Sequence, residues 1–153
     1  MTKAQIVFFK TRVTLAQKLI CWQTDSPYSH VGLVFDGQLL IESQLPEGVQ
    51  WNTFIYDPAI HDVFDVFQVT PDEGRQVYRF VYSQLGKGYD YWGCLRFISR
   101  RRLPENDKWF CSELVFEAFL QAGRPLLNRI DSYQVSPGDL ATSPYLCKAP
   151  DES

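Results

Sequence analysis

One of the four cysteines in this chain is placed where a thiol could act as a nucleophile. Cys111 opens the segment CSELVFEAFLQA, which has helical spacing and ends before Gly123, a residue type that often terminates helices. The free N–H groups and the dipole at a helix N-terminus stabilise a thiolate, and they can hold the oxyanion of a tetrahedral intermediate. The alternative is a plain core thiol, because Cys111 shares one helical face with Leu114 and Ala118.

The base that such a thiol needs has few candidates, because the chain contains only two histidines. His61, in YDPAIHD, is interpreted as a loop residue, whereas His30 opens an apolar, β-rich run. Glu42 lies on the following run, where a hydrogen bond to the imidazole would satisfy its carboxylate, fix the ring tautomer and stabilise the imidazolium. The alternatives are a structural strand histidine and a glutamate that points to water.

The pairing of His30 with Glu42 depends on the loop between the two runs. The Asp-Gly pair at 36–37 is a strong hairpin signal. A two-residue loop would place Glu42 opposite Val31, on the face away from His30. A three-residue loop at 36–38 would place Glu42 opposite Gly32, on the same face as His30 and diagonal to it. A Cys-His-Glu arrangement therefore predicts the three-residue loop.

The elements that would position these residues follow from hydrophobic periodicity and turn signals. We expect strands at 4–9, 48–54 and 62–69, a hairpin at 30–43, and helices at 13–23, about 70–85, about 90–100 and about 111–122. Thr70, Pro71 and Glu73 form a capping box with proline at the first helical position. The proline-containing tail is expected to be mostly loop. This order predicts an α+β fold, with an antiparallel sheet packed against helices.

Length and composition set the broad class. The chain has 153 residues, which predicts a single domain over 1–153, and its 45% hydrophobic and 22% charged residues are typical of globular proteins. The net charge of −3 gives no reason to expect a nucleic-acid partner. The absence of a long apolar run or a secretion signal predicts no integral membrane segment and a cytoplasmic location, with export from the cell by another route as the alternative. No Cys-x-x-Cys pair supports a metal site, and no cofactor is implied.

Two segments resemble the catalytic motifs of the NlpC-type, papain-like cysteine peptidases. Residues 29–43, SHVGLVFDGQLLIES, resemble the His strand-turn-strand of that family, in which the third catalytic group lies twelve residues after the His, as Glu42 does after His30. Residues 109–119, WFCSELVFEAF, are similar to the nucleophile helix, including the small residue Ser112. Here the Cys helix follows the His strand, which resembles the circularly permuted branch of YiiX- and YaeF-like amidases. Residues 86–93 and 135–144 also look like that branch.

The resemblance implies a permuted papain-like fold and a cysteine hydrolase that cleaves an amide bond, of the peptide or cell-wall stem-peptide type. Cys111, His30 and Glu42 would form its triad and pass through an acyl-enzyme. Tyr28, Gly32 and Ser112 are expected to contact a small peptide, amide or ester substrate, with Gly32 leaving room beside the sheet.

Other functions stay open at this point. The first is a lipid or ester hydrolase or acyltransferase of the LRAT-like type, and the second is a non-catalytic binding module. The basic residues between Arg96 and Arg102 are interpreted as a solvated helix end, with recognition of a substrate carboxylate or phosphate as the alternative. The sequence gives no prediction of oligomeric state.

Overall fold

The computed structural model describes residues 3–44, 46–89, 108–131 and 134–150. The expected helix at about 90–100 and the basic residues Arg96–Arg102 lie outside the described residues. The described elements, in chain order, are β1 (Ala4–Phe9), α1 (Leu15–Thr24), β2 (His30–Phe35), β3 (Leu39–Gln44), β4 (Gly48–Thr53), β5 (His61–Val66), α2 (Pro71–Ser83), β6 (Gly88–Tyr89), β7 (Lys108–Trp109), α4 (Cys111–Gln121), α5 (Pro137–Ala141) and β8 (Leu146–Lys148). Within these ranges, no helix is both long and apolar enough to cross a bilayer.

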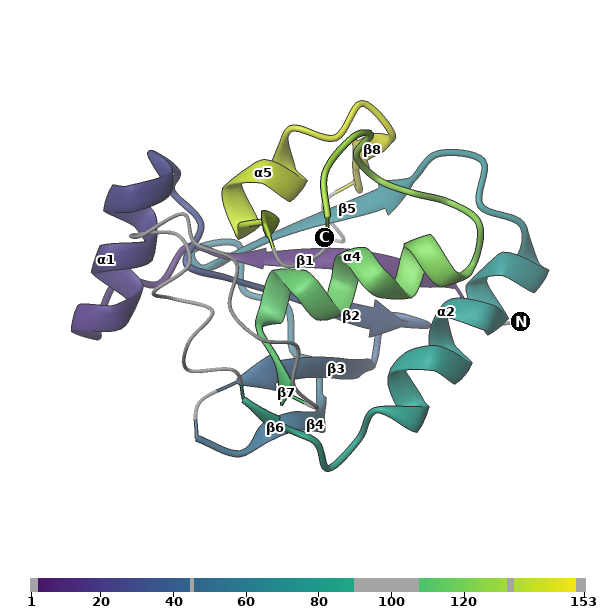
Figure 1. Cartoon of the computed structure of the whole chain (residues 1–153), viewed down its shortest axis with the longest axis horizontal. Coiled ribbons are helices and arrows are strands. Elements are labelled where there is room, and N and C mark those ends of the chain that lie inside the picture. Colours follow the sequence, from purple (N-terminus) through teal and green to yellow (C-terminus); the bar gives the residue numbers. More distant parts are fainter. Residues whose placement is uncertain (1–2, 45, 90–107, 132–133, 151–153) are drawn as a thin grey trace.

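Six of the strands form one antiparallel sheet in the order β4-β3-β2-β1-β5-β8. The helices α2 and α4 lie across one face of this sheet, while α1 stands beyond the end at which β1 finishes and β2 begins (Figure 1). The expected α+β class, with an antiparallel sheet packed against helices, is confirmed.

Strand alternation divides the apolar side chains between the two faces of the sheet. In β1, Ile6 and Phe8 belong to the main core under the helices, whereas Val7 belongs to a smaller cluster with Val34 and Leu40. The main core also takes the inner face of α4, where Leu114, Val115, Ala118 and Phe119 are fully buried. Burial of these side chains orients α4 and therefore fixes where its first residue, Cys111, lies.

The hairpin between β2 and β3 has the three-residue loop that the site requires. Leu33 pairs with Ile41 and Phe35 pairs with Leu39, which leaves residues 36–38 as the loop. Asp36 and Gly37 adopt positive φ angles of 52° and 72°, the combination found in a type I′ turn, and the Gln38 N–H donates to the Phe35 carbonyl at 3.1 Å. The predicted register is confirmed, and it brings Glu42 beside Gly32.

Most expected elements are present, with two corrections. The capping box at the start of α2 is confirmed, because Thr70 accepts from the Glu73 N–H and the Glu73 side chain accepts from the Thr70 N–H. His61 is not a loop residue, because it opens β5. The tail is also less irregular than expected. It contains α5, which Ser136 caps, and β8, which completes the edge of the sheet by pairing with β5. Both tail elements are too short to show periodicity.

The path of the chain into α4 depends on a close backbone contact at Gly48. Gly48 has a φ of 87°, and a Cβ placed there would lie 2.2 Å from the carbonyl oxygen of Lys87. This contact holds β4 against the segment that becomes β6, and β6 pairs in parallel with β7, which leads directly into α4. Gly48 therefore helps to position the approach to Cys111.

We expect Gly48→Ala to be much more damaging than Gly37→Ala. Both positions have positive φ, which costs a residue with a Cβ about 1–2 kcal/mol. A Cβ on Gly37 would have open space, whereas one on Gly48 would collide with backbone atoms that cannot move aside independently. Urea unfolding should show a loss of about 3 kcal/mol or more for Gly48→Ala. Equal losses for the two variants would contradict this account.

Candidate active site

A buried hydrogen bond joins the side chains of His30 and Glu42. His30 Nε2 lies 2.9 Å from Glu42 Oε2, and the two side chains are 12% and 5% exposed. Because a carboxylate accepts, Nε2 is the ring nitrogen that donates. The other nitrogen, Nδ1, is left for Cys111, which lies close enough to this ring to raise its pKa.

Cys111 is the first residue of α4, and the start of this helix differs from those of the other described helices. The helices α1, α2 and α5 each begin with a capping box. In α4 the N-cap is Phe110, whose backbone is extended and whose side chain makes no capping hydrogen bond. A phenylalanine side chain has no acceptor to offer the N–H groups of the first turn. These N–H groups can instead stabilise negative charge on or beside Cys111.

Three hydrogen bonds hold the start of α4 against the rest of the fold. The Ser43 hydroxyl, on β3, donates to the backbone oxygen of Trp109. The Trp109 indole N–H donates to Gln84 Oε1 at 3.0 Å. The Ser112 hydroxyl donates to the backbone oxygen of Val135. The position of Cys111 is therefore set by β3, by the end of α2 and by the segment that precedes α5.

Opposing effects act on the protonation of His30. Burial disfavours the imidazolium, but the charge and hydrogen bond of Cys111, followed by those of Glu42, outweigh burial and raise the pKa of His30 to about 10. The arrangement therefore favours a positively charged ring between two groups that can carry negative charge.

His61 belongs to the surroundings of the site, which sequence reasoning missed. It is buried, and the Asp57 N–H donates to its Nδ1 at 2.9 Å. The ring of Phe9 lies 4.9 Å from the ring of His30 and 4.8 Å from that of His61. Phe9 is on β1, between the two strands, and pairs with His30 of β2 and with His61 of β5. Burial outweighs the nearby carboxylates and lowers the pKa of His61. The signal for this cluster is the cross-strand register, which one sequence does not display.

The three residues expected to contact substrate make other contacts in the structure. The Tyr28 hydroxyl donates to Asp62 at 2.8 Å, and burial with this bond raises the pKa of Tyr28 to about 12. The space in front of Gly32 is taken, because a Cβ there would lie 2.9 Å from Leu40 and 3.2 Å from Glu42. Ser112 is fully buried, and its hydroxyl donates to the backbone oxygen of Val135. These contacts indicate packing and positioning, with Gly32 making room for Glu42.

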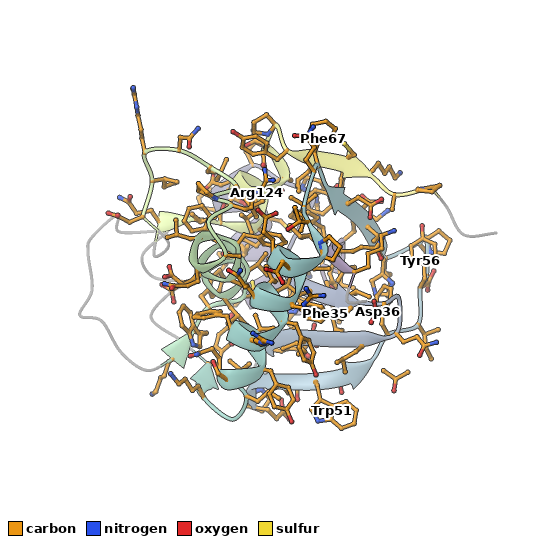
Figure 2. The ribbon with its side chains drawn as sticks, turned by 90° about the vertical axis from the view of Figure 1, so that its right-hand side faces the viewer. Phe35, Asp36, Trp51, Tyr56, Phe67 and Arg124 are labelled. Carbon is orange, nitrogen blue, oxygen red and sulfur yellow. The ribbon has the colours of Figure 1, made fainter. Side chains whose placement is uncertain are left out.

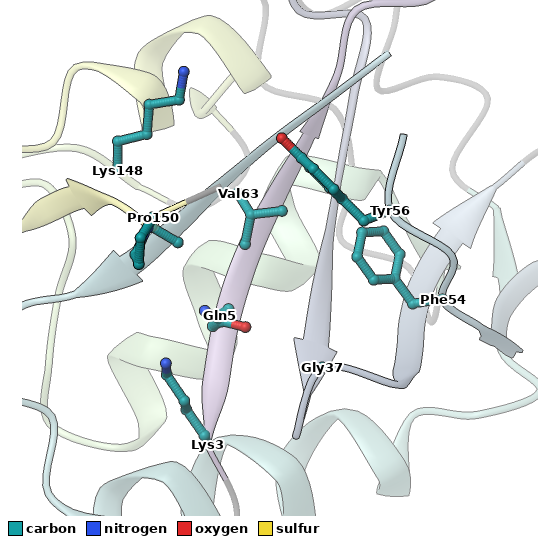
Figure 3. Close-up of a pocket in the computed structure, with 9 residues that line it drawn as sticks. Lys3, Gln5, Gly37, Phe54, Tyr56, Val63, Lys148 and Pro150 are labelled. Atoms are coloured by element: carbon teal, nitrogen blue, oxygen red, sulfur yellow. The ribbon is translucent and has the colours of Figure 1, made fainter. Parts of the chain in front are cut away.

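A pocket on the described surface lies away from these residues. Its lining includes Phe54, Tyr56 and Val63, with Lys3 and Lys148 among its other members (Figure 3). None of Cys111, His30 or Glu42 lines it. The pocket is therefore separate from the candidate site.

Comparison with known proteins gives a match of fold. No family model matches the chain, and no curated protein matches its sequence. The solved structures that it resembles include the crystal structure of the metalloprotein YiiX (DUF1105) from Escherichia coli O157:H7, with a TM-score of 0.72 and 18% sequence identity. The match covers 98% of this chain and 97% of that chain. The fold is YiiX-like. At this identity the likeness concerns the fold alone.

The description of that neighbour as a metalloprotein raises the question of a metal site here. Among the described residues, no group of three or more His, Cys, Asp or Glu side chains could hold an ion. His30 uses Nε2 on Glu42, and only its other nitrogen is left for Cys111, so the three groups form a chain and do not converge on one point. The described residues do not fit a metal centre.

The two histidines should titrate in opposite directions from the ordinary value of about 6.5. We expect the imidazole NMR signals of His30 to titrate well above it, near the raised pKa of about 10, and those of His61 below it. Glu42→Gln should lower the pKa of His30, because it removes a negative partner. The signals that disappear in the spectrum of His30→Gln are those of His30, and the remaining imidazole signals belong to His61.

The same shift makes a prediction about stability. The contribution of the charged ring should be fully present below pH 6.5 and lost as the pH rises towards 10, because the folded-state pKa of His30 is raised. The difference in unfolding free energy between the wild type and His30→Gln should therefore shrink over that range. A difference that grows with pH, or two histidines that both titrate near 6.5, would contradict the geometry described.

Proposed function

We propose that this protein is a cysteine hydrolase in which Cys111 is the nucleophile, His30 the general base and acid, and Glu42 the group that orients His30. The observation that carries the proposal is the buried His30–Glu42 hydrogen bond next to a thiol at the start of α4. A buried carboxylate is costly without a partner, and an imidazole held between a carboxylate and a thiol is the arrangement that activates a thiol nucleophile.

The proposed reaction runs through an acyl-enzyme. His30 holds the proton of Cys111 at Nδ1, and the thiolate attacks the carbonyl carbon of the substrate. The backbone N–H of Cys111 stabilises the resulting oxyanion. As the tetrahedral intermediate collapses, His30 gives its proton to the leaving amine and the carbon–nitrogen bond breaks. Water, deprotonated by His30, then attacks the thioester, which releases the acid and returns the proton to the Cys111–His30 pair.

We favour an amide or peptide bond as the one that is cleaved. An amine leaves only when it is protonated, and the raised pKa of His30 keeps a proton beside the reacting carbon. The resemblance to NlpC-type amidases points to the same bond and to peptides of the cell-wall stem type. An ester substrate of the lipid hydrolase or acyltransferase type would use the same three residues.

Burial of the thiol separates this proposal from its plainest alternative. Cys111 is 1% exposed, as a core cysteine would be, so a substrate reaches the sulfur only when the side chains that cover it move apart. Cys21 is also buried, at 5% exposure, and it forms no hydrogen bond with His30, Glu42 or Cys111. Cys21 is therefore a matched control for burial without activation.

We expect iodoacetamide to modify Cys111 faster than Cys21 at neutral pH, because only a thiolate reacts rapidly. His30→Ala should slow the modification of Cys111 about tenfold or more and leave that of Cys21 unchanged. Mass spectrometry of tryptic peptides over time measures both rates in one sample. If Cys111 reacts as slowly as Cys21, and its rate is the same in His30→Ala as in the wild type, the thiol is a core residue and the protein is better described as a binding module.

Turnover should depend on the triad in a graded way. Against a panel of peptide amides and esters, Cys111→Ala should abolish hydrolysis, whereas Glu42→Gln should lower kcat about 10–100-fold, because it leaves the base and nucleophile in place. Cys21→Ala is the control and should keep wild-type rates. Full activity of Cys111→Ala would overturn the assignment.

A further inference from the structure

Helix α1 presents an apolar surface to solvent. Leu15 is 73% exposed, Leu19 42% and Trp22 76%, and their spacing of four and three residues places them on one side of the helix. On the opposite side, Ile20 and Cys21 are buried. An ordinary surface helix has polar residues where α1 has these three, so a helix that is apolar on both sides needs a second explanation.

Val13 extends this surface beyond the helix. It precedes the N-cap Thr14 and is 83% exposed. A hydrophobic residue at this position commonly packs on the fourth residue of the helix, but that residue is Lys18 here. Val13 therefore stays in solvent next to the turn that carries Leu15. We call Val13, Leu15, Leu19 and Trp22 the α1 apolar surface.

The exposed charged side chains next to this surface include two cations, Arg12 and Lys18. The other two basic residues of the stretch 1–24, Lys3 and Lys10, form ion pairs with Asp65 and Asp62 of β5, and this stretch contains no acidic residue. Arg12 and Lys18 are exposed, and neither forms an ion pair with any residue that the structure describes. The first acidic residue of the chain is Asp25, at the C-cap of α1. Exposed tryptophan and leucine flanked by exposed basic side chains match the interface of an anionic lipid bilayer.

We propose that the α1 apolar surface, with Arg12 and Lys18, docks this protein on membranes that contain anionic lipids. Trp22, Leu19, Leu15 and Val13 enter the boundary between headgroups and acyl chains, and the two cations contact lipid phosphates. The surface lies at the end of the sheet where β1 finishes and β2 begins, which is the end that carries His30 (Figure 1). The docking stands on α1 alone and does not depend on the chemistry of Cys111.

Vesicle flotation of the full chain tests this proposal. We expect the wild type to float with vesicles of mixed phosphatidylglycerol and phosphatidylcholine, and to float less with pure phosphatidylcholine or at high salt. Trp22→Gln with Leu19→Gln should weaken binding about tenfold or more. Trp51→Gln is the matched control, because Trp51 is 62% exposed on β4 and projects from the far edge of the sheet (Figure 2). This control should bind as the wild type does.

Two further variants separate charge from apolar contact. Arg12→Gln with Lys18→Gln should remove the preference for anionic vesicles. Val13 lies outside the helix, so Val13→Gln should weaken binding even if the double substitution in α1 disturbs folding. Thermal unfolding measures whether each variant is folded. The proposal is overturned if the wild type does not float, or if Trp22→Gln and Trp51→Gln bind alike. It is also overturned if sedimentation without vesicles shows a dimer that Trp22→Gln disrupts, because the surface then binds a second copy of the chain.

Discussion

The hydrogen bond between His30 and Glu42 is the constraint on which the candidate site depends. It exists only in one register of the β2–β3 hairpin, because a shift of one residue would turn Glu42 to the other face of the sheet. The three-residue loop between Phe35 and Leu39 sets that register. Gly32 then leaves the space that the Glu42 side chain fills. A carboxylate at 4% exposure needs this bond, since burial without a partner is costly.

The position of Cys111 has a different origin from that of its partners. His30 and Glu42 are held by strand pairing, whereas Cys111 is held by the packing of α4 on the main core and by the hydrogen bonds of Trp109 and Ser112. Two independent parts of the fold thus meet at one end of the sheet. The close contact at Gly48 ties them together, because it fixes β6 and β7 against β4 just before α4 begins.

The two histidines show how local partners decide charge. Both are largely buried, and both pair across β1 with Phe9. Cys111 and Glu42 both favour the protonated ring of His30, so its pKa rises in spite of burial. For His61 burial is the larger effect, and its pKa falls. The two imidazole rings lie on β2 and β5, on either side of Phe9 in β1, yet they differ in charge near neutral pH. His30, the charged ring, is the one that lies beside the Cys111 thiol.

The sequence by itself determined the α+β class, the capped start of α2, the helix that begins at Cys111 and the hairpin turn at Asp36-Gly37, whereas the strand pairing decided between the two loop lengths that the turn allowed. These features are local, since each follows from a turn signal, a cap or a hydrophobic period within a few residues. The tertiary structure decided the contacts of Tyr28, Gly32 and Ser112, the burial of His61 and the outward face of α1. Those depend on which distant segment lies against each side chain. Asp62, Val135 and Phe9 are near Tyr28, Ser112 and His61 in space but far from them along the chain, and no local pattern records that proximity.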